Sequence, residues 1–405
     1  MSDPMTALIN HAGDPLTWES LAEAVSGPFQ PVVTSDDAIA VAIGLLQAIH
    51  HEGTVTLADA GAELETEGLE GKTAQAGGKA RAPLTDRADI MTLLDGPSRG
   101  QIRFLTSGTT GPRKQVIHGL ATLLRGVRRH PSLAQARWGS GYHPAHMAGV
   151  QVLLQALATG CPVVQLFGLE REPLRQRLHD HRITHLSATP SFYRFLLPTL
   201  KGREFPDISQ VTLGGEAFDP QLAAALREAF PAARIRNIYA STEAGSLFVA
   251  DGDAFLVGEA LEGSVKIEQG ELWLARDLLG DWDGTPAWYA TGDWVEIVDP
   301  APLRFRFVGR STTGINVGGY TVHPETVEAA LCGHPAIAGA RVFGRPQALV
   351  GNLLMAELVA EPGMTPPGEA AIRKFLTRTC QPFEIPRILR FVDSLDQTPS
   401  GKIRR

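Results

Sequence analysis

The chain has 405 residues, of which 43% are hydrophobic and 20% charged, and its formal net charge is −7. These values exclude a fibrous, low-complexity or wholly disordered protein, and at roughly 100–200 residues per domain the length allows two or three domains. The acidic balance, together with the lack of any basic run longer than a pair, gives no electrostatic argument for binding to nucleic acid.

The first 106 residues contain one clear helix pattern and two strand patterns. Residues 36–50 have apolar side chains at helical spacing behind a pair of aspartates, and residues 54–58 alternate like a short strand. Residues 61–95 are polar, glycine-rich and charged, which predicts a poorly packed connection. Residues 101–106 predict a strand that leads directly into a Ser/Thr/Gly loop.

Between residues 116 and 230, apolar helices alternate with short apolar strands. Helices are expected at 149–157 and 174–181, and strands at 162–166 and 211–213. Strands that alternate with helices favour βαβ units and a largely parallel sheet.

After residue 258 the pattern changes to short alternating runs separated by Gly, Asp and Pro, which indicate an antiparallel β region. Strands are expected there at 264–268, 271–275, 294–298 and 305–308. A smaller α+β pattern then follows, with helices at 324–331 and 368–379 and strands at 340–343, 353–359 and 387–391. The expected fold class is therefore α/β, with a large N-terminal domain (1–309), a hinge (310–313) and a smaller α+β C-terminal domain (314–405).

The cysteines and the N-terminus bear on the compartment. Cys161, Cys332 and Cys380 lie far apart without CxxC spacing, so we expect reduced thiols in a cytoplasmic protein. Residues 1–15 carry acidic and polar side chains where a signal peptide has a basic and then an apolar segment. The sequence contains no continuous stretch of about 18 apolar residues, so no membrane partner is expected.

The segment 106–114, with the sequence TSGTTGPRK, carries the most chemical information. Its glycines allow tight turns, its N–H groups and hydroxyls can surround phosphate oxygens, and Lys114 adds a cation. It is not a Walker loop, because Gly108 and Gly111 are too close and no Lys-Ser/Thr follows the second glycine. Alone, the segment fits a phosphate loop and an ordinary Ser/Thr/Gly turn about equally well.

Further segments follow this loop in a fixed order. They are YHPAHMAG at 142–149, LGGE at 213–216, NIYASTE at 237–243, YATGD at 289–293, FVGR at 307–310, GGYTVHPE at 318–325 and PSGK at 399–402. Together they resemble the signatures of the acyl-adenylate-forming (AMP-binding) superfamily, which comprises acyl- and aryl-CoA synthetases, firefly luciferase and the adenylation domains of peptide synthetases. The layout is similar to that of short acyl- or aryl-CoA synthetases such as O-succinylbenzoate–CoA ligase, with a shortened N-terminal region.

The resemblance implies an ATP- and Mg²⁺-dependent ligase with a mobile C-terminal domain. A carboxylic acid and ATP would give acyl-AMP, and the acyl group would then pass to coenzyme A. Transfer to the phosphopantetheine of an acyl carrier protein is the alternative, since both thiols end in the same pantetheine arm. A catalytically degenerate nucleotide-binding module is disfavoured, because Lys402, Glu243 and Asp293 are all present. A homodimer is common in the family, and no residue here decides it.

The same resemblance assigns roles to individual residues. Glu243 would bind Mg²⁺, the Thr242 hydroxyl would donate to phosphate, and the Lys402 ammonium would act on the carboxylate and α-phosphate. Asp293 and Arg310 would bind ribose, and Arg310 alternatively phosphate. Tyr239 would stack on adenine, with a core tyrosine as the alternative. The residues expected to bind ATP or AMP are Thr106, Ser107, Gly108, Thr109, Thr110, Gly111, Lys114, Gly215, Glu216, Tyr239, Ala240, Ser241, Asp293 and Arg310.

The pocket for the acid is assigned to Tyr142, His146, Gly149, Gly214 and Ala240. His146 is counted among the catalytic candidates as a gating residue, although a satisfied core histidine is an equal alternative. Ala240 replaces a usual glycine, which argues weakly for a shorter or flatter acid, because one methylene changes pocket binding by about 1–3 kcal/mol.

Some residues depart from the family pattern or suggest other chemistry. Thr312 stands where the hinge usually carries a charge, and Asn316 stands where many members have lysine. His143 and His146 are spaced as i and i+3, and histidines also gather at 179–185. Apart from Asp180, neither cluster has a neighbouring Cys or acidic partner in a recognised metal pattern, so zinc is disfavoured.

Overall fold

A computed structural model of the chain describes residues 5–60, 81–105, 115–310, 314–317, 320–347 and 351–396. The chain divides into two compact units. Unit 1 comprises Met1–Gly215, Leu226–Asp251 and Ala275–Ala287, and unit 2 comprises Glu216–Ala225, Gly252–Leu274 and Trp288–Arg405. The expected domains 1–309 and 314–405 with a hinge at 310–313 stay a prediction.

The larger sheet of unit 1 is mostly parallel. Its strand order is β12-β11-β10-β9-β7-β8-β1-β2, and only the outermost strands, β12 and β2, pair antiparallel with their neighbours. The strands are β1 (Thr6–Ile9), β2 (Pro15–Thr17), β7 (Trp138–Ser140), β8 (Val163–Gln165), β9 (His185–Ala188), β10 (Gln210–Gly214), β11 (Arg234–Ser241) and β12 (Gly245–Ala250). The short strands β7, β8 and β9 are buried throughout, as expected for a parallel sheet covered on both faces.

The second sheet of unit 1 has the order β3-β4-β5-β6, in which β6 alone is antiparallel among the described strands. These strands are β3 (Val32–Thr34), β4 (Thr54–Ala58), β5 (Gln101–Leu105) and β6 (Gln115–Gly119). The pair formed by Leu105 and Gln115 brings together the two ends of segment 106–114. The expected loop therefore connects two hydrogen-bonded strands.

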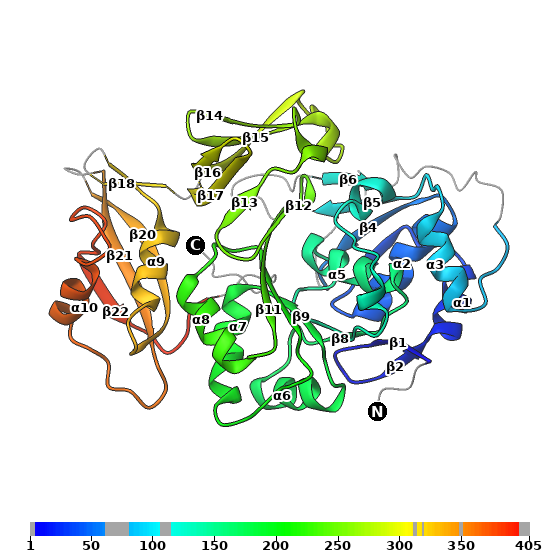
Figure 1. Cartoon of the computed structure of the whole chain (residues 1–405), viewed down its shortest axis with the longest axis horizontal. Coiled ribbons are helices and arrows are strands. Elements are labelled where there is room, and N and C mark those ends of the chain that lie inside the picture. The colour runs from blue at the N-terminus through cyan, green and yellow to red at the C-terminus, as the bar shows by residue number, and fades with distance from the viewer. Residues whose placement is uncertain are drawn as a thin grey trace. The chain divides into compact units, whose positions relative to one another are not determined.

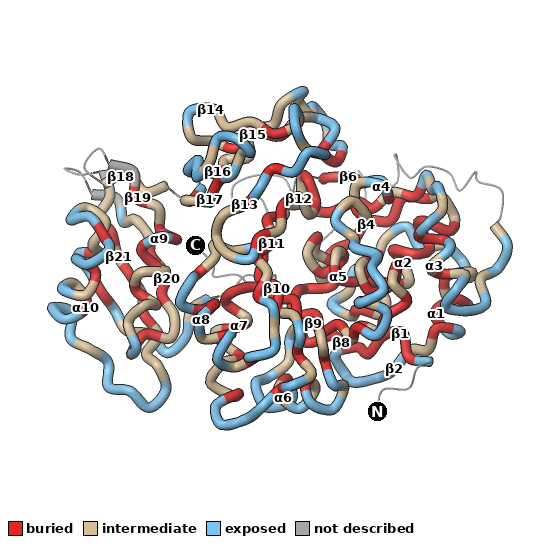
Figure 2. The backbone as a smooth tube through the Cα atoms, viewed as in Figure 1, coloured by how far each residue is buried: buried red, intermediate tan, exposed pale blue. Residues whose placement is uncertain are grey.

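Helices surround these two sheets (Figure 1). They are α1 (Trp18–Ser26), α2 (Ala38–His50), α3 (Arg87–Asp95), α4 (Leu120–Leu124), α5 (Met147–Ala158), α6 (Arg171–Asp180) and α7 (Pro190–Leu196). Helix α8 (Pro220–Ala229) follows β10 and is divided between the two units after Ala225. Helix α2 touches β1 of the larger sheet and β3, β4 and β5 of the smaller one. This central place explains why α2 is buried on most of its faces (Figure 2).

The prediction that residues 61–95 form a poorly packed connection was wrong for its last part. Residues 61–80 lie outside the described part of the chain, but α3 covers Arg87–Asp95. The Asp86 carboxylate accepts a hydrogen bond from the Asp89 N–H and caps this helix. Ile90 and Leu94, one turn apart, are at most 1% exposed and join the core. The many charged side chains of this stretch masked its apolar face.

Unit 2 contains a sheet with the order β13-β17-β16-β15-β14, whose pairs β13–β17, β16–β17 and β14–β15 are antiparallel. Its strands are β13 (Ala254–Leu256), β14 (Val265–Glu268), β15 (Glu271–Ala275), β16 (Trp288–Pro300) and β17 (Leu303–Arg310). The expected antiparallel region is thus present. Strand β16 is longer than predicted, and its cross-strand pairs with β17 run from Asp293 to Pro300, past both ends of the expected strand at 294–298.

The second sheet of unit 2 has the order β19-β18-β21-β20, and β22 pairs with β21. Its strands are β18 (Ile315–Val317), β19 (Tyr320–Val322), β20 (Ile337–Gln347), β21 (Gly351–Ala360) and β22 (Ile388–Phe391). Helices α9 (Pro324–Cys332) and α10 (Glu369–Leu376) share one apolar core with this sheet. The α/β class expected from the sequence is confirmed.

Candidate active site

The candidate site in unit 1 lies at the carboxyl ends of parallel strands, where open α/β sheets bind ligands. Tyr142 follows β7, and its hydroxyl donates to the carbonyl of Ala188 at the end of β9 at 2.8 Å. The same hydroxyl lies 3.4 Å from the carbonyl of Gly214, at the end of β10. A Cβ added to Gly214 would be 3.1 Å from this hydroxyl, so the close approach favours glycine. Two of the expected pocket residues are thereby brought into contact.

Segment 106–114 lies outside the described residues, so the contacts of Thr106 to Lys114 stay predictions. The strands on either side of it are described, and β6 reaches a second signature segment. The His118 ring on β6 places Nε2 2.7 Å from the carbonyl oxygen of Thr242. The strand that leaves the expected phosphate loop therefore contacts the turn that carries Glu243.

The turn with Thr242 and Glu243 connects β11 and β12, and Ser241 and Gly245 face each other at its base. Gly245 has a φ of +67°, which favours glycine at this position. The Gly280 N–H donates to the carbonyl of Glu243 at 2.8 Å. Neither His118 nor Gly280 was found from the sequence, because neither stands in a segment that resembles a family signature.

The chemistry of this turn fits Mg²⁺. The Glu243 carboxylate and the Thr242 hydroxyl are hard oxygen donors, and both residues are partly exposed. Mg²⁺ is usually bound by one or two carboxylates together with substrate phosphates. The expected arrangement of Glu243 as ligand therefore needs no other protein donor.

The residues before this turn differ in exposure along β11. Tyr239 is 9% exposed, and its ring lies 5.6 Å from that of Phe248. Ala240 and Ser241 are partly exposed, and the Ser241 hydroxyl accepts the N–H of Ala244. The tyrosine is thus packed inside unit 1, and its stacking on adenine stays a prediction.

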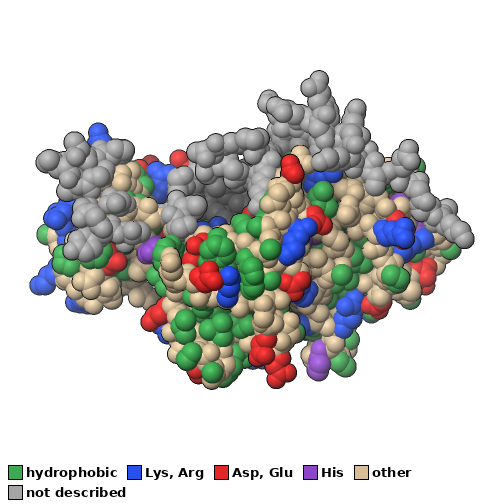
Figure 3. Space-filling model, turned by 90° about the horizontal axis from the view of Figure 1, so that it is seen from above, with side chains coloured by type: hydrophobic (Ala, Val, Ile, Leu, Met, Phe, Trp, Pro, Cys, Tyr) green, Lys and Arg blue, Asp and Glu red, His purple; other side chains and the backbone are tan. Residues whose placement is uncertain are grey.

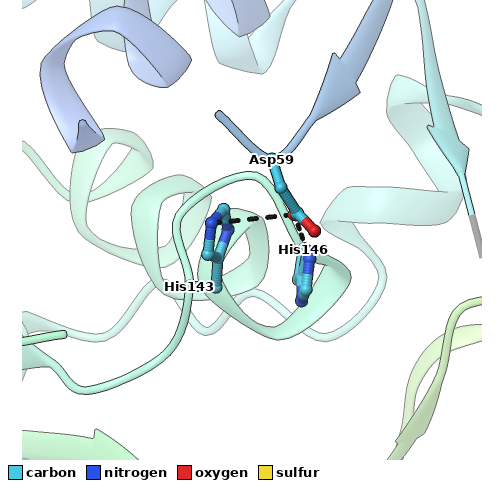
Figure 4. A group of neighbouring side chains, drawn as sticks. All are labelled: Asp59, His143 and His146. Atoms are coloured by element: carbon cyan, nitrogen blue, oxygen red, sulfur yellow. Dashed lines mark hydrogen bonds and ion pairs between the residues drawn. The ribbon is translucent and has the colours of Figure 1, made fainter. Parts of the chain in front are cut away.

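The expected pocket histidine belongs to a group of neighbouring side chains (Figure 4). His146 Nε2 lies 2.5 Å from Asp59 Oδ1, and His143 Nε2 lies 2.8 Å from Asp36 Oδ1 and 3.6 Å from Asp59 Oδ1. The expectation that these histidines have no acidic partner was therefore wrong. Asp59 follows β4 and Asp36 precedes α2, so both are far from the histidines in the sequence.

Asp59, His143 and His146 place one donor atom each within 4.8 Å of the others, as metal ligands would. Two features favour a hydrogen-bonded group instead. The two imidazoles are stacked, with ring centroids 4.3 Å apart and an interplanar angle of 27°, and His143 Nε2 lies nearer to Asp36 Oδ1, at 2.8 Å, than to Asp59 Oδ1, at 3.6 Å. The Ala145 N–H also donates to His143 Nδ1 at 3.2 Å, whereas a metal on Nε2 requires a proton on Nδ1.

The electrostatics of His143 agree with this arrangement. Burial lowers the pKa of His143, nearby His146 lowers it further, and the hydrogen bond to Asp36 raises it again. The His143 ring is therefore neutral near pH 7, accepts at Nδ1 and donates from Nε2 to the Asp36 carboxylate.

Gly149, the remaining glycine of the expected pocket, lies in the first turn of α5. A Cβ at this position would be 2.2 Å from the carbonyl oxygen of His143. Gly149 therefore allows α5 to approach the backbone of the histidine segment. Its observed contact is structural, and a role in contacting the acid stays a prediction.

Unit 2 holds the residues expected at ribose. Asp293 on β16 is 1% exposed, and Arg310 on β17 donates from Nε to its Oδ1 at 2.7 Å. The two residues face each other in the strand register. The Asp293 N–H donates to the Thr291 hydroxyl at 3.0 Å. Asp293 and Arg310 thus form an ion pair in which the carboxylate is buried and the Arg310 side chain is 49% exposed.

The other predicted residues lie after β10, on β18 or outside the described residues. Gly215, after β10, has a φ of +82°, and Glu216 follows it as the first residue of unit 2. Asn316 lies on β18 without a described side chain, and Thr312 and Lys402 lie outside the described residues. Their assigned roles stay predictions.

The surface gives two further observations. On the face drawn in Figure 3, acidic and basic side chains of the described residues are interspersed. No helix in the described ranges has the length and apolar character needed to cross a membrane.

Comparison with known proteins identifies the family. The profile of the AMP-binding enzyme family matches residues 30–267, and that of the AMP-binding enzyme C-terminal domain matches residues 326–402. A 4-hydroxybutyrate–CoA ligase of Metallosphaera sedula is 29% identical over 75% of this chain, which spans 61% of that protein. A probable 2-succinylbenzoate–CoA ligase of Mycobacterium tuberculosis is 29% identical over 74% of this chain and 81% of its own length.

The fold agrees with that of a solved structure. The o-succinylbenzoate CoA synthetase of Bacillus subtilis, in complex with its acyl-adenylate intermediate, has a TM-score of 0.67 and 18% identity. The similarity covers 98% of this chain and 94% of that one. The first family profile alone spans more than half of the chain, and the resemblance inferred from the ordered signatures is confirmed: this chain belongs to the AMP-binding enzyme family.

Proposed function

We propose that this chain is an AMP-forming acid–thiol ligase that joins a carboxylic acid to coenzyme A. In the first step a carboxylate oxygen attacks the α-phosphorus of ATP, and pyrophosphate leaves to give acyl-AMP. In the second step the thiol of coenzyme A attacks the acyl carbon, loses its proton and displaces AMP.

One observation carries this proposal. The turn with Thr242 and Glu243 is hydrogen-bonded to β6, the strand that leaves the expected phosphate loop. An anionic acid must approach a polyanion in the first step, so the site has to neutralise developing charge. A magnesium ion on Glu243 would supply that neutralisation when bound. Thr242 would donate a hydrogen bond to a phosphate oxygen.

Lys402 would complete the first step by placing its ammonium near the carboxylate and the α-phosphate. This role follows from the family resemblance and requires the PSGK segment to reach the bound acid and nucleotide. The same lysine is not required for thiol transfer. Loss of Lys402 should therefore slow acyl-AMP formation and leave thioester formation intact.

The proposal is tested by pyrophosphate release with a panel of aryl, short-chain and long-chain acids. Glu243→Gln should slow release by about 10²–10³-fold, the loss typical of removing one electrostatic group. The exposed Glu204→Gln serves as the matched control and should leave the rate unchanged. Lack of pyrophosphate release with every acid would contradict the proposed ligase activity.

The second half-reaction is tested with preformed acyl-AMP. Lys402→Ala should slow adenylation by a similar factor and still convert acyl-AMP to a thioester. Equal losses in both half-reactions would contradict the role of Lys402. Coenzyme A and a phosphopantetheinylated carrier protein are offered as competing thiols, and faster transfer to the carrier would contradict coenzyme A as acceptor.

A further inference from the structure

His118 lies where β6 meets the turn between β11 and β12. The residue is 0% exposed, and its Nε2 lies 2.7 Å from the carbonyl oxygen of Thr242. The ring of Phe104 on β5 makes an edge-to-face contact with the imidazole, at a centroid distance of 5.9 Å and an interplanar angle of 74°. A Cβ at Gly280 would be 2.7 Å from two atoms of the ring, so glycine is needed for this approach. The imidazole is therefore enclosed by three separate segments.

The same segments also bond to one another through their backbones. The Gly280 N–H donates to the carbonyl of Glu243 at 2.8 Å. Ile117 and Asp281 exchange two hydrogen bonds, of 2.8 and 2.7 Å, which fasten the loop with Gly280 to β6. The carbonyls of Thr242 and Glu243 are thus both held, the first by a side chain and the second by a backbone N–H.

The protonation of the ring follows from these contacts. A carbonyl oxygen only accepts, so Nε2 must carry the hydrogen. Burial is the main cause that lowers the pKa of His118, and the ring is neutral near pH 7. Nδ1 is then a bare acceptor, buried without a hydrogen-bond partner among the described residues. An unpartnered buried acceptor costs stability, which an apolar side chain of similar size would not.

His118 therefore lowers the stability of the core through Nδ1, which has no partner among the described residues, and provides one directed hydrogen bond through Nε2. We propose that His118 is a positioning residue for adenylation, which fixes the Thr242–Glu243 turn against the strand leaving segment 106–114. The effect on turnover rests on the proposed function. The effect on the turn itself does not, because the hydrogen bond is independent of any substrate.

Two variants separate the hydrogen bond from packing. His118→Leu fills the space without a donor, whereas His118→Gln keeps an amide N–H near the position of Nε2. The matched control is His50→Leu at the end of α2, because His50 is also buried and its Nδ1 also lacks a partner in the described part of the chain. His50 has no contact with the turn.

The first readout is hydrogen exchange of the full-length protein without ligand. His118→Leu should exchange at least tenfold faster in peptides covering residues 240–246 and 278–282, while its denaturation midpoint equals or exceeds that of wild type. His118→Gln should restore most of the protection, and His50→Leu should leave both peptides unchanged. Unchanged exchange in His118→Leu, or equal acceleration in His50→Leu, would overturn the proposal.

The second readout is the affinity for Mg·ATP, followed by pyrophosphate release. His118→Leu should weaken Mg·ATP binding about tenfold, the size of one hydrogen bond, and lower kcat/KM at least as much. Wild-type activity in His118→Leu would overturn the catalytic part of the proposal. If wild type releases no pyrophosphate while the exchange pattern is as expected, the proposed function fails and the positioning of the turn stands.

Discussion

Asp59 shows how a single side chain can control the orientation of His146, a residue expected in the acid pocket. Its carboxylate lies 2.5 Å from His146 Nε2, and both residues are partly exposed. Hydrogen bonds that involve an ionised group are shorter and stronger than neutral ones. The rotamer of His146 is therefore set by a residue 87 positions away in the sequence.

Asp59→Ala should release the His146 ring and lower kcat/KM for the acid. A hydrogen bond to a charged group contributes roughly 1.5–3 kcal/mol, which corresponds to about a 10–100-fold loss. The KM for ATP should stay within about twofold, because His146 is expected in the acid pocket and not at the nucleotide. Steady-state kinetics with each substrate varied in turn measure this difference.

Asp59→Asn is the companion variant. Its amide oxygen can still accept from Nε2, so it should recover part of the loss in Asp59→Ala. If both variants bind the acid as wild type does, the pair between Asp59 and His146 has no role in the pocket.

Among the helices, α5 can begin close to the His143 backbone because residue 149 is glycine. Gly149→Ala would place a Cβ 2.2 Å from the carbonyl oxygen of His143, and backbone atoms cannot move aside as a flexible side chain can. The helix or the histidine segment must shift. We expect a loss of about 1–3 kcal/mol in the free energy of unfolding, as for other overpacked sites.

Urea denaturation measures this loss, and Gly258→Ala is the control. Gly258 has a negative φ, and a Cβ there meets nothing within 4 Å. Wild-type stability in Gly149→Ala would show that α5 can retreat from His143 without cost.

The bounds of individual helices and strands show which parts of the fold can be predicted from the sequence. Strand β4 was predicted with its observed bounds, because residues 54–58 alternate and end at polar residues. Helix α2 was predicted from its apolar spacing behind a pair of aspartates, of which Asp37 is the cap. Helix α3 was missed, because its few apolar side chains stand among charges. Strand β16 pairs with β17 from Asp293 to Pro300, beyond both ends of the predicted strand at 294–298, and no local pattern in one strand contains that information.

Most candidate residues came from the ordered signatures, and their supporting partners did not. His118, Gly280 and Asp59 act through residues more than thirty positions away, so only the folded chain brings them to their sites. Gly149 was assigned to the pocket, whereas its contact is with the backbone of His143. A motif specifies the chemistry of a segment, and tertiary packing decides which side chains hold it in place.

At the scale of the molecule, buried histidines couple stability to pH. Burial lowers the pKa of His185 to about 4, from an ordinary value of 6.5. Burial is also the main cause of the lowered pKa values of His50, His118, His143 and His181. The unfolded chain therefore binds protons below pH 6.5 that the folded chain does not, and stability falls as the pH decreases.

The slope due to His185 should run from about pH 6.5 to about pH 4, with up to about 1.4 kcal/mol lost for each pH unit. Urea denaturation across this range should show a shallower slope in His185→Gln, because one proton fewer is taken up on unfolding. The exposed His130→Gln should keep the wild-type slope. An identical slope in His185→Gln would contradict the assignment.

The order of strands in the larger sheet has a consequence for synthesis on the ribosome. β1 is buried throughout and pairs with β8, where Leu8 faces Val163. At about 5–20 residues per second, roughly 8–30 s pass between the emergence of these two partners. During that interval the apolar strand β1 lacks its parallel neighbour. Chaperone contact with residues 6–9 would thus matter most before β8 is made.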